Sequence, residues 1–264
     1  MKFKTTLLMG VVASSLVSAE PCKLGEAYPA ATWLSKVDET RAQKSAEIAA
    51  LESFAFTLTG TDGERQGIRT DGLLIIQDGA IIYEKYARGF DEAKRHISWS
   101  VAKSISSALV GVAVQRGAAK LDDSICTYLT EYTGQPVCDI TLKHAITFAT
   151  GLAWQEEYED QSYQVSSIIS MHFGEGYKDQ LKHVLSTRLA HKPGTAWSYS
   201  TGDAQIAAAT AKRALEKTDG TDPFWTVLFN KIGAPNFAFE EDAKGTPMGG
   251  DLVYATPRDF ARFG

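Results

Sequence analysis

The sequence lacks several features that would indicate particular classes of protein. Only three of its 264 residues are cysteine, too few for the disulfide framework of a small secreted domain. Its five histidines form neither an H-x-H pair nor an H-E-x-x-H motif, so we expect no zinc centre and no cofactor. No basic run with interleaved aromatics is present, and the net charge of −5 gives no field that attracts phosphate or anionic lipid. We therefore expect no nucleic-acid partner.

Long apolar runs are also missing after the first twenty residues. The N-terminus has Lys2 and Lys4, an apolar stretch over residues 5–17, and small residues up to Ala19. This order is typical of a secretory signal peptide. We predict a signal peptide over residues 1–19, a periplasmic or secreted location, and no integral membrane segment after cleavage. An uncleaved N-terminal anchor is the alternative, and the oligomeric state is not readable.

What is present is the composition of an ordinary globular protein, with 44% apolar and 22% charged residues. In an exported protein Cys126 and Cys138 can form a disulfide, and two free buried thiols are the alternative. Nothing in the sequence decides between them.

The first half of the chain predicts helix, hairpin and helix. Residues 28–52 are rich in Ala, Glu and Lys and indicate an amphipathic helical region. Residues 72–86 contain two apolar runs around Asp78-Gly79, which is typical of a β-hairpin. Residues 98–115 have apolar side chains at helical spacing, and Gly117 is expected to end this buried helix.

The second half predicts mainly short helices. Residues 120–190 show no convincing pair of strands, and one helix is expected from Thr141 to Gly151. A helix through residues 206–215 follows the turn at 192–195, with Thr201 or Asp203 as its cap. Thr256-Pro257 has the chemistry of a helix start.

Ser100 and Lys103 form an S-x-x-K sequence at the head of the buried helix. Positions i and i+3 share a helical face, so the amine can reach the hydroxyl and activate it as a nucleophile. No acidic residue lies between residues 97 and 120. Burial without a counter-ion favours a neutral lysine, which is a usable base. N–H groups at the helix start are suited to stabilising an oxyanion. A chance, purely structural S-x-x-K is the alternative.

Tyr199 follows a turn and precedes a helix start, 99 residues after Ser100. A phenol near an ammonium group can relay a proton, so Tyr199 could activate Ser100 or protonate a leaving group. A tyrosine that packs its ring against a loop is the alternative.

Five phrases occur in an order that resembles the serine β-lactamase-related hydrolases. They are S-W-S-V-A-K-S, L-D-D-S-I-C-T-Y-L, I-T-L-K-H-A-I-T-F-A-T-G-L, P-G-T-A-W-S-Y-S and G-G-D-L-V-Y-A-T-P-R-D-F-A-R-F-G. The resemblance covers residues 70–264 and extends to class C β-lactamases, D-alanyl-D-alanine peptidases, family VIII esterases and 6-aminohexanoate-dimer hydrolases.

The resemblance implies a role for each matching residue. Ser100 matches the acylated nucleophile, Lys103 its base and Tyr199 the tyrosine of the second motif. Thr201 stands where the lactamases commonly have Asn, which favours the esterase and amide-hydrolase branches. Tyr158 matches a tyrosine that contacts the scissile amide in 6-aminohexanoate-dimer hydrolases; a loop aromatic that covers the core is the alternative. We therefore assign Tyr158 and Thr201 to substrate binding.

The implied fold is α+β, an antiparallel sheet flanked by helices with an inserted, mostly helical domain. The expected division is residues 20–120 for the first part of the α/β domain, 121–234 for the helical domain, and 235–264 for an incomplete return. The family's third motif belongs after residue 264; residues 244–246 and 172–174 resemble it loosely but come too early. We expect C-terminal strands to be missing and the chain to be a truncated or partial sequence.

The sequence thus predicts a serine hydrolase that cleaves a small ester or amide through an acyl-enzyme. The absence of G-x-S-x-G and of S-D-N counts against an α/β-hydrolase and a class A lactamase. The alternatives are a β-lactamase or D-alanyl-D-alanine peptidase, a non-catalytic penicillin-binding-like sensor, and an inactive fragment.

Overall fold

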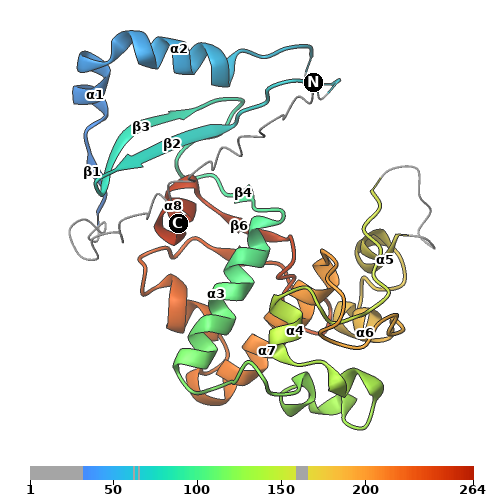
Figure 1. Cartoon of the computed structure of the whole chain (residues 1–264). Helices are drawn as coiled ribbons and strands as arrows, with labels where there is room; N and C mark the ends of the chain where they lie inside the picture. Colours follow the sequence, from blue (N-terminus) through green and yellow to red (C-terminus); the bar gives the residue numbers. More distant parts are fainter. Residues whose placement is uncertain (1–31, 62, 65, 159–165) are drawn as a thin grey trace, which may run out of the picture.

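The computed structural model describes residues 32–61, 63–64, 66–158 and 166–264. The predicted signal peptide lies outside these residues. Figure 1 shows a small sheet with helices beside it, joined to a larger, mainly helical part. This is the α+β arrangement that the sequence predicts.

The expected hairpin is confirmed. Strands β2 (Gly72–Gln77) and β3 (Ala80–Tyr86) pair in antiparallel fashion. The turn uses Asp78 and Gly79, whose φ angles of 49° and 73° are tolerated by Asp and Gly. Strand β1 (Leu34–Ser35) adds to β3 in parallel, so this sheet is not wholly antiparallel.

Helices lie against this sheet. Instead of one helical region over residues 28–52, the described part has α1 (Val37–Gln43) and α2 (Ser45–Phe56), separated by Lys44. They lie along one side of the sheet, and α8 (Pro257–Phe263) contacts β2 (Figure 1). Helix α8 begins as predicted, because the hydroxyl of Thr256 accepts a hydrogen bond from the N–H of Asp259 at 3.2 Å.

A second sheet brings the end of the chain back beside the buried helix. Its order is β4–β6–β5, with β4 at His96–Ile97, β6 at Val253–Ala255 and β5 at Ala238–Phe239. All pairs are antiparallel. Since β4 ends just before Ser100, this sheet fixes the entry of the chain into the next helix.

Helices α3 (Val101–Gln115) and α7 (Thr201–Asp219) pack together at the centre of the core (Figure 1). Helix α3 has the predicted course, and Gly117 has the left-handed φ of 71° that ends it. The predicted cap of α7 is wrong. Ser200 is the N-cap, because its hydroxyl accepts from the N–H of Asp203 at 2.9 Å.

Between α3 and α7, the described residues form short helices and only isolated β-bridges. The helices are η1 (Ile125–Thr127), η2 (Thr130–Tyr132), η3 (Pro136–Asp139), α4 (Leu142–Ile146), α5 (Ser167–Phe173) and α6 (Gln180–Leu185), and η4 (Trp225–Phe229) follows α7. Helix α4 begins after Thr141 as expected but ends at Ile146, well before Gly151. Its continuation is excluded because Phe148 has a φ of 55° and its carbonyl accepts from the N–H of Ser198.

Cys126 and Cys138 form a disulfide, the first of the two alternatives that the sequence left open.

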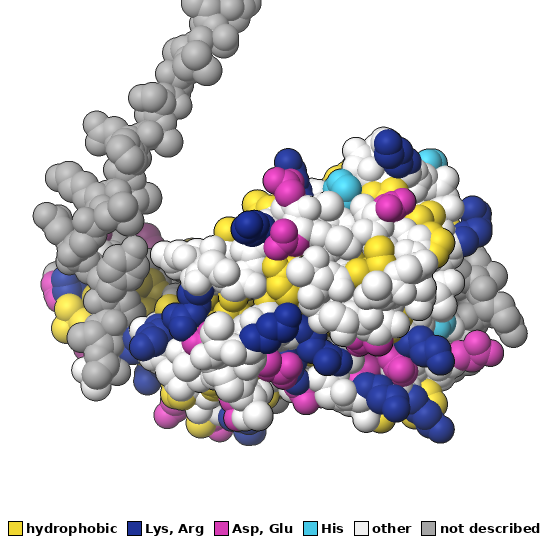
Figure 2. Space-filling model, turned by 90° about the horizontal axis from the view of Figure 1, so that it is seen from below, with side chains coloured by type: hydrophobic (Ala, Val, Ile, Leu, Met, Phe, Trp, Pro, Cys, Tyr) yellow, Lys and Arg dark blue, Asp and Glu magenta, His cyan; other side chains and the backbone are white. Residues whose placement is uncertain are grey.

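Within the described ranges, no helix is long and apolar enough to span a membrane, and no cluster of three metal-ligating side chains occurs. Basic and acidic side chains are interspersed on the face in Figure 2. The predicted domain boundaries are not tested by these features and stay a prediction.

Candidate active site

Ser100 is the N-cap residue of α3, in an exposed position at the head of a buried helix. The residue before it, Trp99, has a φ of 44°, a left-handed conformation that a bulky side chain adopts only when its surroundings impose it. The N–H of Ser98 fixes this turn by donating to the carbonyl of Val253 on β6 at 2.7 Å. The sheet therefore holds the serine out at the surface of the site.

Lys103 lies one turn further along α3, with only 8% of its surface exposed. Its Nζ donates to the Oγ of Ser100 at 3.3 Å and to the carbonyl of Gly250 at 2.8 Å. It forms no ion pair with any residue that the structure describes. The amine thus reaches the serine hydroxyl, as the i, i+3 spacing predicts.

The Gly249-Gly250 pair brings a backbone carbonyl to this lysine. A Cβ on Gly249 would lie 2.3 Å from the Cβ of Ala208, and one on Gly250 would lie 2.5 Å from Cγ2 of Thr201. Any side chain would force this loop away from α3 and α7. The phrase G-G-D-L-V-Y does not by itself predict this role, although paired glycines before a strand are a signal of a close backbone approach.

Tyr199 reaches the site with its ring. The centroid of the ring lies 4.8 Å from Nζ of Lys103, and the side chain is 41% exposed. Its ring also packs against that of Phe148 at 5.2 Å. The hydroxyl of Tyr199 makes no hydrogen bond within the described part of the chain. The three predicted side chains therefore converge, and the proton-transfer role of the phenol stays a prediction.

The first turn of α3 offers fewer N–H groups to an oxyanion than the sequence suggests. Those of Val101, Ala102 and Lys103 donate to the carbonyls of Ser98, Trp99 and Ser100. No such bond is found for the N–H of Ser100 in the described ranges. Among the N–H groups of this turn, that of Ser100 is therefore the one left without an internal acceptor, and its role as an oxyanion donor stays a prediction.

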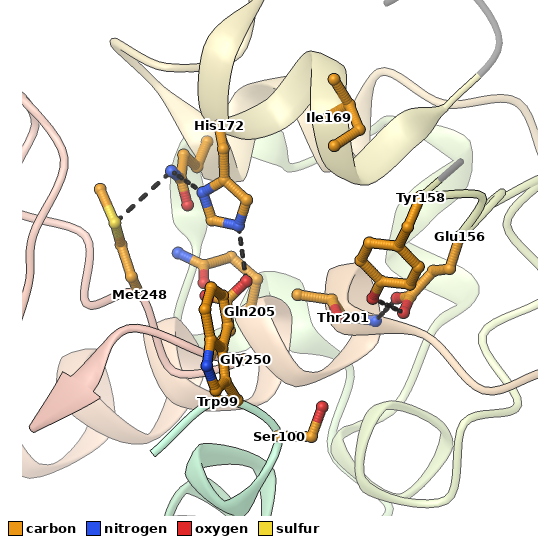
Figure 3. Close-up of polar contacts among 12 residues, drawn as sticks. Trp99, Ser100, Glu156, Tyr158, Ile169, His172, Thr201, Gln205, Met248 and Gly250 are labelled. Carbon is orange, nitrogen blue, oxygen red and sulfur yellow. Dashed lines mark hydrogen bonds and ion pairs between the residues drawn. The ribbon is translucent and has the colours of Figure 1, made fainter. Parts of the chain in front are cut away.

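Glu156 connects the predicted substrate-side residues, and the sequence reasoning did not single it out. Its Oε2 accepts from the hydroxyl of Tyr158 at 3.0 Å, and its Oε1 accepts from the N–H of Thr201 (Figure 3). Oε1 also accepts from Nε1 of Trp154 at 2.8 Å. Partial desolvation and this carboxylate raise the pKa of Tyr158, so its phenol stays a hydrogen-bond donor.

Tyr158 and Thr201, the two predicted substrate residues, line one pocket together with Ser100. Figure 3 shows Ser100 between Trp99 and Thr201. The side chain of Tyr158 is exposed, whereas that of Thr201 is fully buried against Gly250. A direct contact of Thr201 with substrate therefore stays a prediction.

A further residue near the start of α7 is Asp203, which accepts hydrogen bonds from Thr150 and Ser200. Burial raises its pKa to about 6, although these bonds act in the opposite direction.

His172 and Asp251 form a second pair that sequence reasoning missed. Nε2 of His172 on α5 lies 2.6 Å from Oδ2 of Asp251. Nε2 of Gln180 lies 3.3 Å from Nδ1 of His172. These residues are far apart in the sequence, so no local motif could have revealed them. Residues 172–174, which loosely resemble the third family motif, lie at the end of α5 rather than on a strand, and residues 244–246 lie outside this pocket.

Solved structures with a similar fold include three hydrolases of low sequence identity. A protein from Bacillus anthracis assigned as a 6-aminohexanoate-dimer hydrolase has a TM-score of 0.62 and 18% identity, covering 74% of this chain and 53% of its own. The D-alanine carboxypeptidase AmpC from Burkholderia cenocepacia has a TM-score of 0.54 and 19% identity, covering 86% and 63%. A beta-lactamase/D-alanine carboxypeptidase from Pseudomonas syringae has a TM-score of 0.54 and 15% identity, covering 86% and 64%.

The chain thus spans between about half and two thirds of the length of these proteins, and at this identity they show the fold alone. No curated protein sequence matches the chain. A family model for Beta-lactamase matches residues 57–264, which include the S-x-x-K helix, the Tyr199 loop and the Gly249-Gly250 loop. The chain therefore belongs to the Beta-lactamase family.

Proposed function

We propose that this protein is a serine hydrolase that cleaves an ester or amide bond through an acyl-enzyme on Ser100. The observation that carries the proposal is the hydrogen bond of 3.3 Å between Nζ of Lys103 and Oγ of Ser100, at the mouth of a pocket. A hydroxyl becomes a nucleophile when a neighbouring base takes its proton.

The proposed reaction has two steps. In the first, Lys103 takes the proton of Ser100, Oγ attacks the substrate carbonyl carbon, and the bond to the leaving group breaks while that group gains this proton from Lys103, directly or by relay through Tyr199. The N–H of Ser100 stabilises the oxyanion. In the second, water attacks the acyl carbon and gives one proton to Lys103. Lys103 passes this proton to Oγ of Ser100 as the ester bond breaks, which releases the acid and restores the serine and the base.

Esters and linear amides are the proposed substrates rather than β-lactams. The support is Thr201, which stands where the lactamases commonly have Asn, and whose side chain carries no amide and is fully buried. The signal-like leader and the disulfide further support the proposal that the protein acts in the periplasm or outside the cell.

Hydrolysis of p-nitrophenyl butyrate by the chain and by Ser100→Ala tests this function. We expect turnover that Ser100→Ala abolishes. Turnover that persists in the variant contradicts the proposal. Stable labelling by a penicillin probe without any turnover would instead favour the non-catalytic sensor, and absence of a cooperative thermal transition would favour the inactive fragment.

A further inference from the structure

The hydrogen bond between His172 and Asp251 joins two walls of the pocket beside Ser100. Nε2 of His172 lies 2.6 Å from Oδ2 of Asp251, and the two side chains are only 10% and 7% exposed. His172 lies near the end of α5, whereas Asp251 belongs to the loop before β6. Figure 3 shows the imidazole directed from α5 toward Gly250, the neighbour of Asp251 in this loop. A short bond to a carboxylate in a nearly dry position is a strong link.

The carboxylate of Asp251 has no second anchor among the residues that the structure describes. Its Oδ1 is buried and accepts no hydrogen bond there, and its Oδ2 accepts from His172 alone. Removal of the imidazole would leave a buried carboxylate without any donor, which is unfavourable. Asp251 would then turn toward water, so its conformation depends on His172.

The conformation of Asp251 decides where the carbonyl of Gly250 points. That carbonyl and the Cα of Asp251 belong to one planar peptide unit, so they turn together. The same carbonyl accepts from Nζ of Lys103 at 2.8 Å, and Nζ also reaches Oγ of Ser100 at 3.3 Å. A change at Asp251 is therefore transmitted through one peptide unit to the amine beside Ser100.

His172 is itself held in one orientation. Nε2 of Gln180 on α6 lies 3.3 Å from Nδ1 of His172. Because an amide N–H donates to Nδ1, the ring proton lies on Nε2 and is donated to Asp251. Gln180 is buried, and its own backbone N–H donates to Oδ2 of Asp242 at 2.8 Å. The imidazole is thus fixed through both of its nitrogens.

We propose that His172 is a positioning residue for Lys103, the proposed base. By donating to Asp251 it fixes the peptide unit of Gly250, whose carbonyl keeps Nζ of Lys103 within reach of Ser100. His172 acts on the serine only through these groups. This inference rests on the proposed function and adds to it a residue that controls the placement of the base.

Two amides that differ by one methylene test the link. The Nε2 of a glutamine can stand where Nε2 of the imidazole stands and donate to Asp251, whereas asparagine is too short to reach. The readout is the rate at which diisopropyl fluorophosphate, a small probe, labels Ser100. We expect labelling about tenfold slower in His172→Asn than in the natural chain, because a small displacement of a catalytic group has a large effect on rate. Glutamine is expected to restore most of the rate, and equal rates in His172→Asn and His172→Gln overturn the proposal.

A matched histidine and the partner carboxylate supply further variants. His183 lies on the neighbouring helix α6 and does not line the pocket, so His183→Asn is expected to be labelled at the natural rate. Asp251→Ala is expected to slow labelling as His172→Asn does. The double variant should be no slower than the slower single variant, because the two side chains act as one unit. Additive losses, or an equal loss in His183→Asn, overturn the proposal, and Asp251→Ala keeps the test decisive if His172→Asn does not fold.

Steady-state kinetics with p-nitrophenyl butyrate distinguish positioning from a role as a wall of the pocket. Displacement of Lys103 weakens an interaction that acts in the transition state, so we expect His172→Asn to lower kcat about tenfold and to change KM less than about twofold. A rise in KM with an unchanged kcat would make His172 a wall residue only and would overturn the proposal.

Acetylation of Lys103 by acetic anhydride separates this inference from the proposed function. Peptide mass spectrometry measures it relative to the exposed Lys120, without any turnover. We expect it to be about fivefold faster in His172→Asn than in the natural chain, because the amine has lost its carbonyl acceptor. Ser100 labelling and Lys103 acetylation that are both unaffected by His172→Asn would overturn the positioning role and leave the hydrolase. Faster acetylation in a chain whose Ser100 is never labelled would overturn the hydrolase and leave the positioning role.

Discussion

At the scale of single residues, Glu156 holds Tyr158 and Thr201, the two residues predicted to bind substrate. One carboxylate accepts from the indole of Trp154, the phenol of Tyr158 and the backbone of Thr201. An amide in its place has one acceptor oxygen and an NH2 group that faces donors. The loop with Tyr158 would then lose its attachment to the start of α7.

Glu156→Gln is expected to lower kcat/KM for p-nitrophenyl butyrate about tenfold, with most of the loss in KM, because Tyr158 is no longer held at the pocket. Steady-state kinetics measure this. Glu157→Gln is the matched control, since Glu157 is exposed and, among the described residues, its side chain accepts a hydrogen bond from Gln155 alone. Equal kinetics of the two variants would contradict the positioning role.

Asp203 predicts a dependence of stability on pH. Its pKa is raised from 3.8 to about 6 in the folded protein, mainly by burial. Between these values the folded state binds more protons than the unfolded state, so this group's contribution is full below pH 4 and is lost as pH rises through 6.

We therefore expect the stability of the chain relative to Asp203→Asn to fall by about 2–3 kcal/mol between pH 4 and pH 7. Urea unfolding of both proteins across this range measures it. A difference that stays constant, or that grows with pH, would show that the folded pKa is not raised.

At the scale of elements, the loop before β6 is held against the two central helices, α3 and α7. Ser106 on α3 donates to the carbonyl of Gly249 at 2.7 Å, and Lys103 donates to that of Gly250 at 2.8 Å. Thr201 on α7 leaves no room for a side chain on Gly250. The position of Lys103, the proposed base, thus depends on a close approach of backbone to helix.

Gly250→Ala is expected to lower the free energy of unfolding by about 1–3 kcal/mol and to slow hydrolysis, because the carbonyl that holds Lys103 must move. Gly111→Ala is the control within α3: no atom lies near its Cβ position, and helix propensity predicts a gain of up to about 1 kcal/mol. Thermal unfolding and kinetics of both variants check this, and a neutral Gly250→Ala would contradict the steric account.

Elements were predictable where the signal is local. The Asp78-Gly79 turn, the apolar spacing of α3 and the Thr256-Pro257 start all act within a few residues. The early end of α4 was not predictable, because it follows from bonds between residues 148–149 and the loop that carries Tyr199. The convergence of Ser100 with Lys103 follows from helical spacing, whereas the contacts of Glu156 and of His172 join distant segments.

At the scale of the whole molecule, the disulfide constrains the helical part. It joins η1 to η3 across a sequence separation of 12, in the part of the chain that forms short helices. Such a link reduces the conformational freedom of the unfolded chain.

Replacing both Cys126 and Cys138 with Ala is expected to lower the free energy of unfolding by about 2–3 kcal/mol. Reductant should lower the stability of the natural chain by a similar amount and leave that of the double variant unchanged. Chemical denaturation with and without reductant measures both, and a natural chain that is insensitive to reductant would contradict a structural role for the disulfide.

The activation of Ser100 by Lys103 is tested most directly by covalent labelling with a fluorophosphonate, read by mass spectrometry of the intact chain and of its peptides. We predict one adduct, on Ser100, absent from Ser100→Ala and formed about 10²–10⁴ times more slowly in Lys103→Met. An adduct on another residue, or equal rates with and without the lysine amine, would contradict the account.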